Sequence, residues 1–138
     1  MTTLALFTAL FLLLVVRITD GVENGLHWAS KPRVQNGTAF HQADLFQTWA
    51  ARILYGLILS ALFGVHLGTG VLFVGIAFVD QALWQMALNY FAAGHPLKGE
   101  LDTAAFLWWP DSPKRFRNER RLLQLLIGAG LVALGALW

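Results

Sequence analysis

The stretch GVLFVGIAFVDQALWQMALNYFAA, residues 70–93, is a long apolar run with one charged side chain, Asp80, near its middle. A bilayer core about 30 Å thick is crossed by about 20 apolar residues in a helix, so this stretch predicts a membrane span. At about 1.5 Å per residue, Asp80 is expected near the midplane. A carboxylate there is costly unless it is paired, hydrated or protonated, which makes Asp80 a candidate functional residue.

Three further apolar runs lie on either side of this stretch, at about 2–19, 49–67 and 122–138. Only Gly68-Thr69-Gly70 separates the second predicted span from the third, which predicts a tight hairpin. Because 57% of the residues are hydrophobic and 13% are charged, the composition is that of a membrane protein. We therefore expect one all-α transmembrane domain over residues 1–138, with four helices in an antiparallel bundle.

All ten lysines and arginines lie in the segments 17–52 and 98–121. Cytoplasmic loops carry an excess of Lys and Arg, so the loops at about 20–48 and 94–121 are expected in the cytoplasm and both termini outside. The run Leu4–Val16 has no basic residue before it and Arg17 after it, which favours a span over a cleaved signal peptide. The pattern is typical of a bacterial-type inner membrane, and it explains the basic residues without nucleic-acid binding.

Both predicted loops have helical features near the membrane. The segment 20–30 contains no proline, so the first helix can continue through it before Pro32. Asn36-Gly37-Thr38 reads as a turn followed by a helix N-cap, so the second helix is expected to begin near Ala39. The chain has no cysteine, so a metal would need His and carboxylate ligands, and no cofactor is required by the sequence.

Polar side chains follow Asp80 at helical spacing. Gln81, Gln85 and Asn89 form a stripe on one face of the predicted third helix, running toward the cytoplasmic side. One interpretation is an ion or proton path, or a cleft for a polar substrate. The other is that these side chains join helices through interhelical hydrogen bonds or line an oligomer contact.

A second polar cluster is predicted at the cytoplasmic ends of the first two helices. Its members are the candidate catalytic residues Asp20, Glu23, His27, His41 and Asp44. Imidazoles with carboxylates can ligate zinc, manganese or iron, or can provide a general base and a metal-activated water for attack on a lipid substrate. The alternative is a solvated polar cap with charge pairing at the helix ends.

Arg17 and Arg52 lie near the cytoplasmic ends of their spans. Long basic side chains there extend to lipid headgroups, and a pair of guanidinium groups can also hold a phosphate or carboxylate. Small residues make the last helix smooth on more than one face and predict close helix contacts: Gly128, Ala129, Gly130, Ala133 and Gly135.

Three classes of function remain open. The favoured one is a small polytopic membrane protein that acts as an oligomeric or complex-forming subunit, with a polar intramembrane site around Asp80. The second is a small ion- or proton-coupled transporter or channel that uses Asp80. The third is a membrane-embedded enzyme with the His and carboxylate cluster at its cytoplasmic face. The expected partners are the lipid bilayer and other membrane subunits or copies of the chain.

Overall fold

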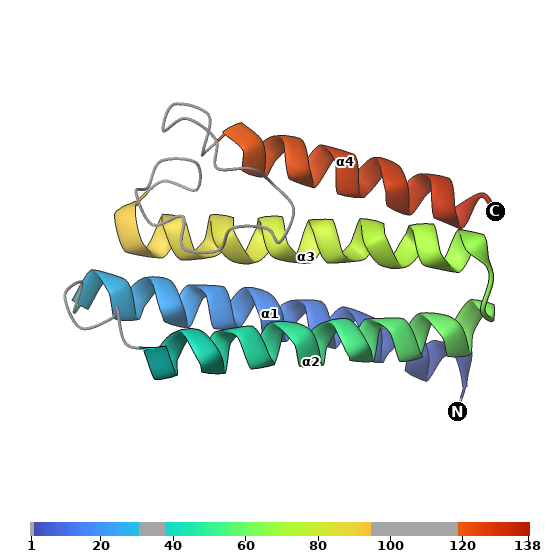
Figure 1. Cartoon of the computed structure of the whole chain (residues 1–138), viewed down its shortest axis with the longest axis horizontal. Coiled ribbons are helices and arrows are strands. Elements are labelled where there is room, and N and C mark those ends of the chain that lie inside the picture. Colours follow the sequence, from blue (N-terminus) through green and yellow to red (C-terminus); the bar gives the residue numbers. More distant parts are fainter. Residues whose placement is uncertain (1, 31–37, 95–118) are drawn as a thin grey trace.

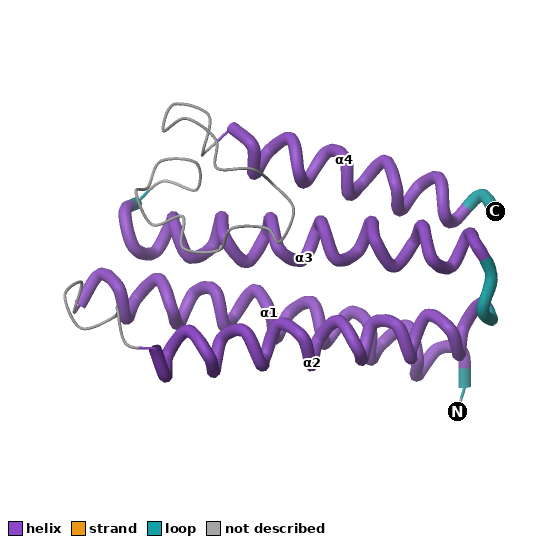
Figure 2. Tube along the Cα trace, viewed as in Figure 1, coloured by secondary structure: helices purple, strands orange, loops and turns teal. Residues whose placement is uncertain are grey.

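The computed structural model contains four helices and describes residues 2–30, 38–94 and 119–138. They are α1 (Thr3–Ser30), α2 (Thr38–Phe63), α3 (Leu67–Ala93) and α4 (Glu119–Ala136). Side chains are not described at 27–30, 38–45, 92–93 and 119–120. The described part of the chain is therefore all-helical, as predicted (Figure 2).

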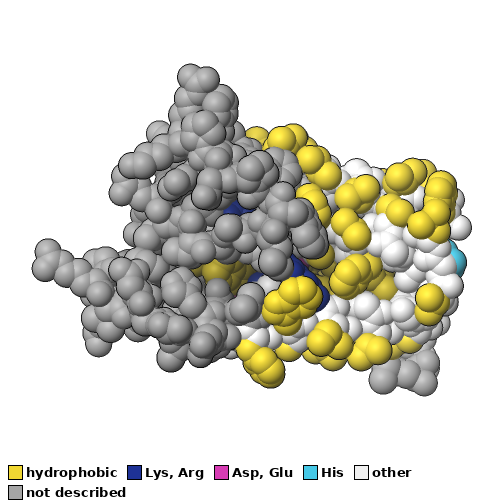
Figure 3. Space-filling view, in the orientation of Figure 1, with side chains coloured by type: hydrophobic (Ala, Val, Ile, Leu, Met, Phe, Trp, Pro, Cys, Tyr) yellow, Lys and Arg dark blue, Asp and Glu magenta, His cyan; other side chains and the backbone are white. Residues whose placement is uncertain are grey.

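Three of the helices are long and apolar enough to cross a membrane. These stretches are Thr3–Leu26, Phe46–Phe63 and Leu67–Phe91, and the apolar part of α4, Arg121–Ala136, is shorter. In the space-filling view, hydrophobic side chains are spread over the described part of the visible face (Figure 3). A membrane location is thus supported by length and composition for three helices.

Both chain ends lie at the same end of the molecule as the α2–α3 turn, which we call the turn end (Figure 1). The first helix continues to Ser30 and the second begins at Thr38, so the predicted helical extensions are confirmed. They carry α1 and the start of α2 well beyond the apolar stretches toward the opposite end of the molecule.

The predicted hairpin at Gly68-Thr69-Gly70 is wrong by a few residues. The helix α2 ends at Phe63, and Gly64 takes a left-handed conformation with φ 79°, which glycine adopts at little steric cost. His66 is the N-cap of α3, where its Nδ1 accepts a hydrogen bond from the Thr69 backbone N–H at 3.4 Å. Residues 68–70 therefore belong to the first turns of α3.

The central helix is α3, which packs against all three others, most extensively against α4 and α1. Its contact with α4 is made by glycines: a Cβ on Gly75 would lie 2.9 Å from the Gly128 carbonyl oxygen, and one on Gly135 would lie 2.9 Å from that of Gly68. The predicted smooth face of the last helix is confirmed at Gly128 and Gly135. These contacts place the two backbones almost in direct contact.

The contact between α1 and α3 also depends on glycine. A Cβ on Gly21 would lie 2.6 Å from the Trp84 carbonyl oxygen, and one on Gly25 would lie 2.5 Å from the Leu88 carbonyl oxygen. Gly21 lies against Trp84 and Gly25 against Leu88, so both pairs are 63 positions apart in the sequence. Because this offset is constant, α1 and α3 run in the same direction. The sequence interpretation missed this Gly-x-x-x-Gly pair, which is a common signal of close helix packing.

Replacing Gly21 by Ala is expected to destabilise the protein by about 1–3 kcal/mol, because the new methyl group overlaps the backbone of α3. Denaturant unfolding in detergent, followed by circular dichroism, measures this difference. The matched control is Gly70→Ala in α3, where a Cβ meets nothing within 4 Å. The control should be neutral or stabilising by about 0.5–1 kcal/mol, since Ala favours helix over Gly. Equal effects of the two changes would contradict the close α1–α3 contact.

Candidate functional site

A buried ion pair joins α1 to α3. The Arg17 Nε donates to Asp80 Oδ2 at 3.2 Å, and the two residues are 3% and 1% exposed. Each lies about 20 Å along its helix from the turn end, since Arg17 is in the middle of α1 and Asp80 in the middle of α3. The pair is separated by 63 positions in sequence, which is the same offset as Gly21 to Trp84 and Gly25 to Leu88.

A third helix reaches the same carboxylate. The hydroxyl of Tyr55, a fully buried residue of α2, donates to Asp80 Oδ1 at 3.0 Å. Both oxygens of Asp80 therefore accept a hydrogen bond, one from α1 and one from α2. A carboxylate that is both paired and hydrogen-bonded can be held in a low-dielectric interior at much lower cost than an isolated one.

The guanidinium of Arg17 also binds two other side chains. Its Nη2 donates to Thr48 Oγ1 at 3.2 Å, and its Nη1 donates to Asp20 Oδ2 at 3.4 Å. The same oxygen of Asp20 accepts a hydrogen bond from Trp84 Nε1 at 2.7 Å. The Arg17 Cζ lies 5.7 Å from the centroid of the Trp84 ring, within range of a cation–π interaction.

We call these six residues, which come from three helices, the Arg17 network: Arg17, Asp20, Thr48, Tyr55, Asp80 and Trp84. Their hydrogen bonds cross all three pairwise interfaces of α1, α2 and α3. Because α2 packs far less extensively on its neighbours than α1 and α4 do on α3, Tyr55 and Thr48 are important for holding it.

The predicted polar stripe on α3 points into the protein. Gln81, Gln85 and Asn89 are all buried, and Gln85 Nε2 donates to Asn89 Oδ1 at 3.1 Å. On α4, Arg121 Nη1 donates to Gln124 Oε1 at 2.8 Å, and both of these residues are buried as well. Buried polar side chains therefore continue along α3 from Asp80 toward the end opposite the turn end, and buried apolar side chains such as Trp84 and Leu88 lie between them.

The predicted catalytic cluster is described only in part. Asp20 belongs to the Arg17 network, whereas Glu23 is exposed. The side chains of His27, His41 and Asp44 lie outside the described residues. Among the side chains that the structure does describe, no group of three or more His, Asp or Glu is arranged to hold a metal ion.

The two arginines expected at lipid headgroups have different surroundings. Arg17 differs from the expectation, because its side chain turns into the protein toward Asp80 instead of extending to the membrane surface. Arg52 is only partly buried, and its Cζ lies 5.3 Å from the centroid of the Trp49 ring. It lines a groove between α2 and α3.

Sequence reasoning missed the partners of Asp80, which are Arg17 and Tyr55, and the bond from Trp84 to Asp20. Arg17 was available as a signal, because a basic residue and an acidic residue at equal depth in two spans can cancel each other's burial cost. Tyr55 and Trp84 carry no such signal, since aromatic residues are common in membrane spans. Their roles depend on how the helices are rotated, which the apolar patterns of these helices do not determine.

Comparison of the chain with protein-family models, with characterised proteins and with solved structures finds no match. The interpretation of the site therefore rests on its geometry. The geometry is that of a set of hydrogen bonds joining three helices, in which the guanidinium of Arg17 is paired with the carboxylates of Asp80 and Asp20.

The Arg17–Asp80 pair can be tested with a double-mutant cycle. Arg17→Gln alone is expected to lower the free energy of unfolding by about 3–5 kcal/mol, because it leaves the buried Asp80 carboxylate without its ion-pair partner. Asp80→Asn alone should cost less, because Arg17 keeps its ion pair with Asp20. The double variant, which removes both charges of the Arg17–Asp80 pair, should be clearly more stable than the sum of the two single effects predicts. Unfolding in detergent measures all four proteins. Additive losses would show that the two side chains do not interact.

Proposed function

We propose that this chain is a small integral membrane protein that acts as a subunit of a homo-oligomer. In this proposal all four helices cross the bilayer in an up-and-down arrangement. Both termini and the α2–α3 turn face outward, and the segments 31–37 and 95–118 face the cytoplasm. The proposal is supported by the closed Arg17 network, by the packing of α4 and by the distribution of basic residues.

The orientation follows from charge. The turn end holds the N-terminus, the α2–α3 turn and the C-terminus (Figure 1), and no lysine or arginine occurs in residues 1–16, 53–97 or 122–138. Arg17 and Arg52 lie in the middle of α1 and α2, Arg120 and Arg121 lie at the start of α4, and the other six basic residues fall between the helices in sequence, within 31–33 and 98–117. The positive-inside rule therefore favours a cytoplasmic location for the end opposite the turn end, as in a bacterial-type inner membrane.

The observation that carries the proposal is the state of Asp80. Its two oxygens accept hydrogen bonds from Arg17 and Tyr55, and 1% of its surface is exposed. A carboxylate in this state joins helices, which is the packing role that polar residues commonly have in membranes. An ion- or proton-coupled carrier would have to displace at least the Arg17 bond in every cycle, so the geometry supports that alternative less well.

The surface that we assign to self-association is on α4. This helix packs on α3 alone among the described helices, and its apolar part, Arg121–Ala136, is about 24 Å long, less than the bilayer core. A short span can be accommodated by oligomerising. Leu126, Gly130 and Leu134 are exposed and follow one another at intervals of four residues, so they form one face of the helix. A second copy of the chain covers this face in our proposal.

The cysteine-free chain allows a direct test by disulfide formation. Gly130→Cys is expected to form a covalent dimer when an oxidant is added to native membranes, because the proposed interface places residue 130 of two copies together. The control is Leu57→Cys on α2, which is 62% exposed and, like Gly130, lies six residues from the turn end of its helix. Gel mobility without reductant distinguishes monomer from dimer.

Efficient cross-linking at 130 with only background cross-linking at 57 is the expected result. If both positions react equally and weakly, the proposed interface is wrong. A cross-linked product at residue 130 that is larger than a dimer of this chain would show that a different subunit, and not a second copy of the chain, covers this face.

A further inference from the structure

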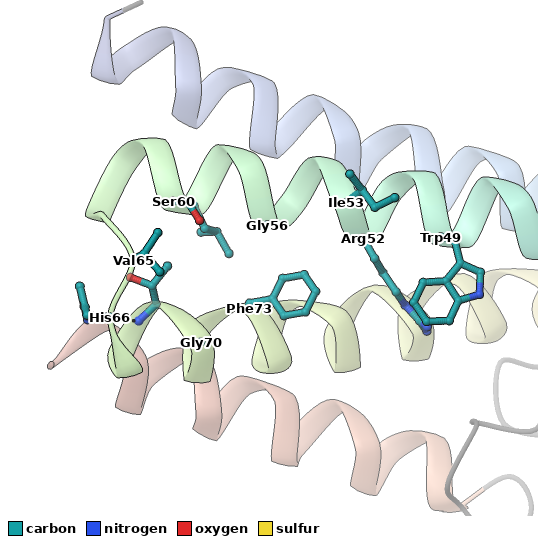
Figure 4. Close-up of a pocket in the computed structure, with 11 residues that line it drawn as sticks. Trp49, Arg52, Ile53, Gly56, Ser60, Val65, His66, Gly70 and Phe73 are labelled. Atoms are coloured by element: carbon teal, nitrogen blue, oxygen red, sulfur yellow. Dashed lines mark hydrogen bonds between the residues drawn. The ribbon is translucent and has the colours of Figure 1, made fainter.

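A groove of about 360 Å³ runs along the surface between α2 and α3. At the turn end it is lined by Ser60 and His66, and at its other end by Trp49 and Arg52 (Figure 4). The walls between these ends are mostly apolar, and Gly56, which has no side chain, leaves room midway along α2. The groove therefore connects the surface beside the α2–α3 turn with the side chain of Arg52.

The Arg52 end of the groove lies at mid-membrane depth in the proposed orientation, in which the turn is at the outer surface. Arg52 precedes the end of α2 at Phe63 by eleven residues, or about 16 Å, and the hydrocarbon core is about 30 Å thick. On α3, Asp80 follows Leu67 by thirteen residues, or about 20 Å. Arg52 is also within electrostatic reach of Asp80 and Arg17. It therefore belongs to the same layer of the membrane as the buried ion pair.

A guanidinium at this depth requires polar surroundings. The side chain of Arg52 is only partly buried, and it extends from α2 toward α3 beside the Trp49 ring (Figure 4). The ring centroid lies 5.3 Å from the Arg52 Cζ, so one side of the cation is covered by an aromatic face. Contact of the exposed part with lipid tails is costly, and charged side chains at this depth face the protein interior or a water-filled cavity. The space beside Arg52 therefore favours a polar occupant over hydrocarbon.

The charges around Arg52 favour a neutral occupant. The two arginines of this layer, Arg17 and Arg52, are matched in number by two carboxylates. These belong to Asp20 and Asp80, and both are paired with Arg17. A phosphate or an acidic side chain in the groove would add a negative charge to a balanced set in low-dielectric surroundings. Water adds none, and 360 Å³ holds about a dozen water molecules at ~30 Å³ each.

We propose that the groove between α2 and α3 is a water-filled vestibule, open at the turn end, that hydrates Arg52 near the membrane midplane. The proposal rests on the membrane location and orientation proposed above, and it adds an aqueous path that ends at a positive charge. The groove between α1 and α4 provides a contrast. It is larger, about 560 Å³, but none of its lining residues is charged, so it offers water no such partner.

The cysteine-free chain allows water in the groove to be detected by thiol modification. Gly56→Cys places a thiol in the groove, where a Cβ makes only ordinary contact, 3.7 Å from the Phe73 ring. The control is Leu57→Cys, one residue further along, because Leu57 is 62% exposed and is not in the lining. Membrane vesicles are treated with the impermeant anion sulfonatoethyl methanethiosulfonate, and mass spectrometry counts the modified chains. Residue 56 should react about tenfold faster than residue 57 or more, because a thiol among lipid tails stays protonated and unreactive.

The charge at the inner end is tested in the Gly56→Cys background. The anionic reagent is compared with its cationic trimethylammonium analogue at low salt, and each rate is divided by that of free cysteine. Arg52→Gln removes a unit charge about 12 Å from residue 56, one helical turn plus the length of the side chain, and should lower the anion-to-cation rate ratio roughly threefold. Arg52→Lys keeps the charge and should leave the ratio nearly unchanged. If Arg52→Gln fails to fold by circular dichroism, the comparison of residues 56 and 57 still decides, since it leaves Arg52 in place.

Val65→Cys separates the vestibule from the orientation on which it rests. Val65 lies in the turn and is 90% exposed, so its modification reports which face of the membrane holds the turn. Every variant is tested in right-side-out and in inverted vesicles. Reaction of residue 65 only from the cytoplasmic face would contradict the proposed orientation, and residue 56 reacting from that same face would still support the vestibule.

Two results would overturn the vestibule. One is equal reactivity of residues 56 and 57 from the face that modifies residue 65, which would mean that lipid or a helix of another chain fills the groove. The other is reaction of residue 56 only from the opposite face, which would mean that Arg52 is hydrated from the other side of the membrane. Neither result bears on cross-linking at residue 130, so the vestibule and the α4 interface can fail separately.

Discussion

The hydrogen-bonded ion pair between Arg17 and Asp80 fixes how the first three helices fit together. Two charges of opposite sign in a low-dielectric interior tolerate little separation, because each one is costly alone. The pair therefore determines which residue of α1 lies beside which residue of α3. The glycine contacts at Gly21 and Gly25 follow at the same sequence offset, so charge pairing and steric fit require one and the same register.

The other elements are held by different forces. Close backbone contact through Gly75 and Gly128 holds α4 against α3, and no charge pair is needed for it. In contrast, α2 packs lightly and is joined to the rest by Tyr55 and Thr48, whose hydroxyls bind the two members of the ion pair. This difference leaves space beside α2, where the groove with Arg52 at one end is found.

The helices and their approximate limits could be predicted, because apolar length and proline positions are local properties of the sequence. The extension of α1 to Ser30 and the start of α2 at Thr38 follow from such signals. The turn was misplaced, since three glycines lie within residues 64–70 and the sequence does not say which one adopts a positive φ. The inward direction of Arg17 was missed for a related reason. Snorkelling and ion pairing are both available to an arginine at this depth, and only the rotation of α1 against α3 decides between them.

The central claim is that Arg17 and Asp80 are bonded inside the membrane. Solid-state NMR of the chain in lipid bilayers, with ¹⁵N-labelled arginine and ¹³C-labelled aspartate, measures this contact directly. A dipolar coupling between Arg17 Nε and the Asp80 carboxyl carbon, as required by the 3.2 Å contact, is the predicted result. Coupling of the Arg17 nitrogens to lipid ³¹P, with none to Asp80, would contradict the account and place this side chain at the headgroups.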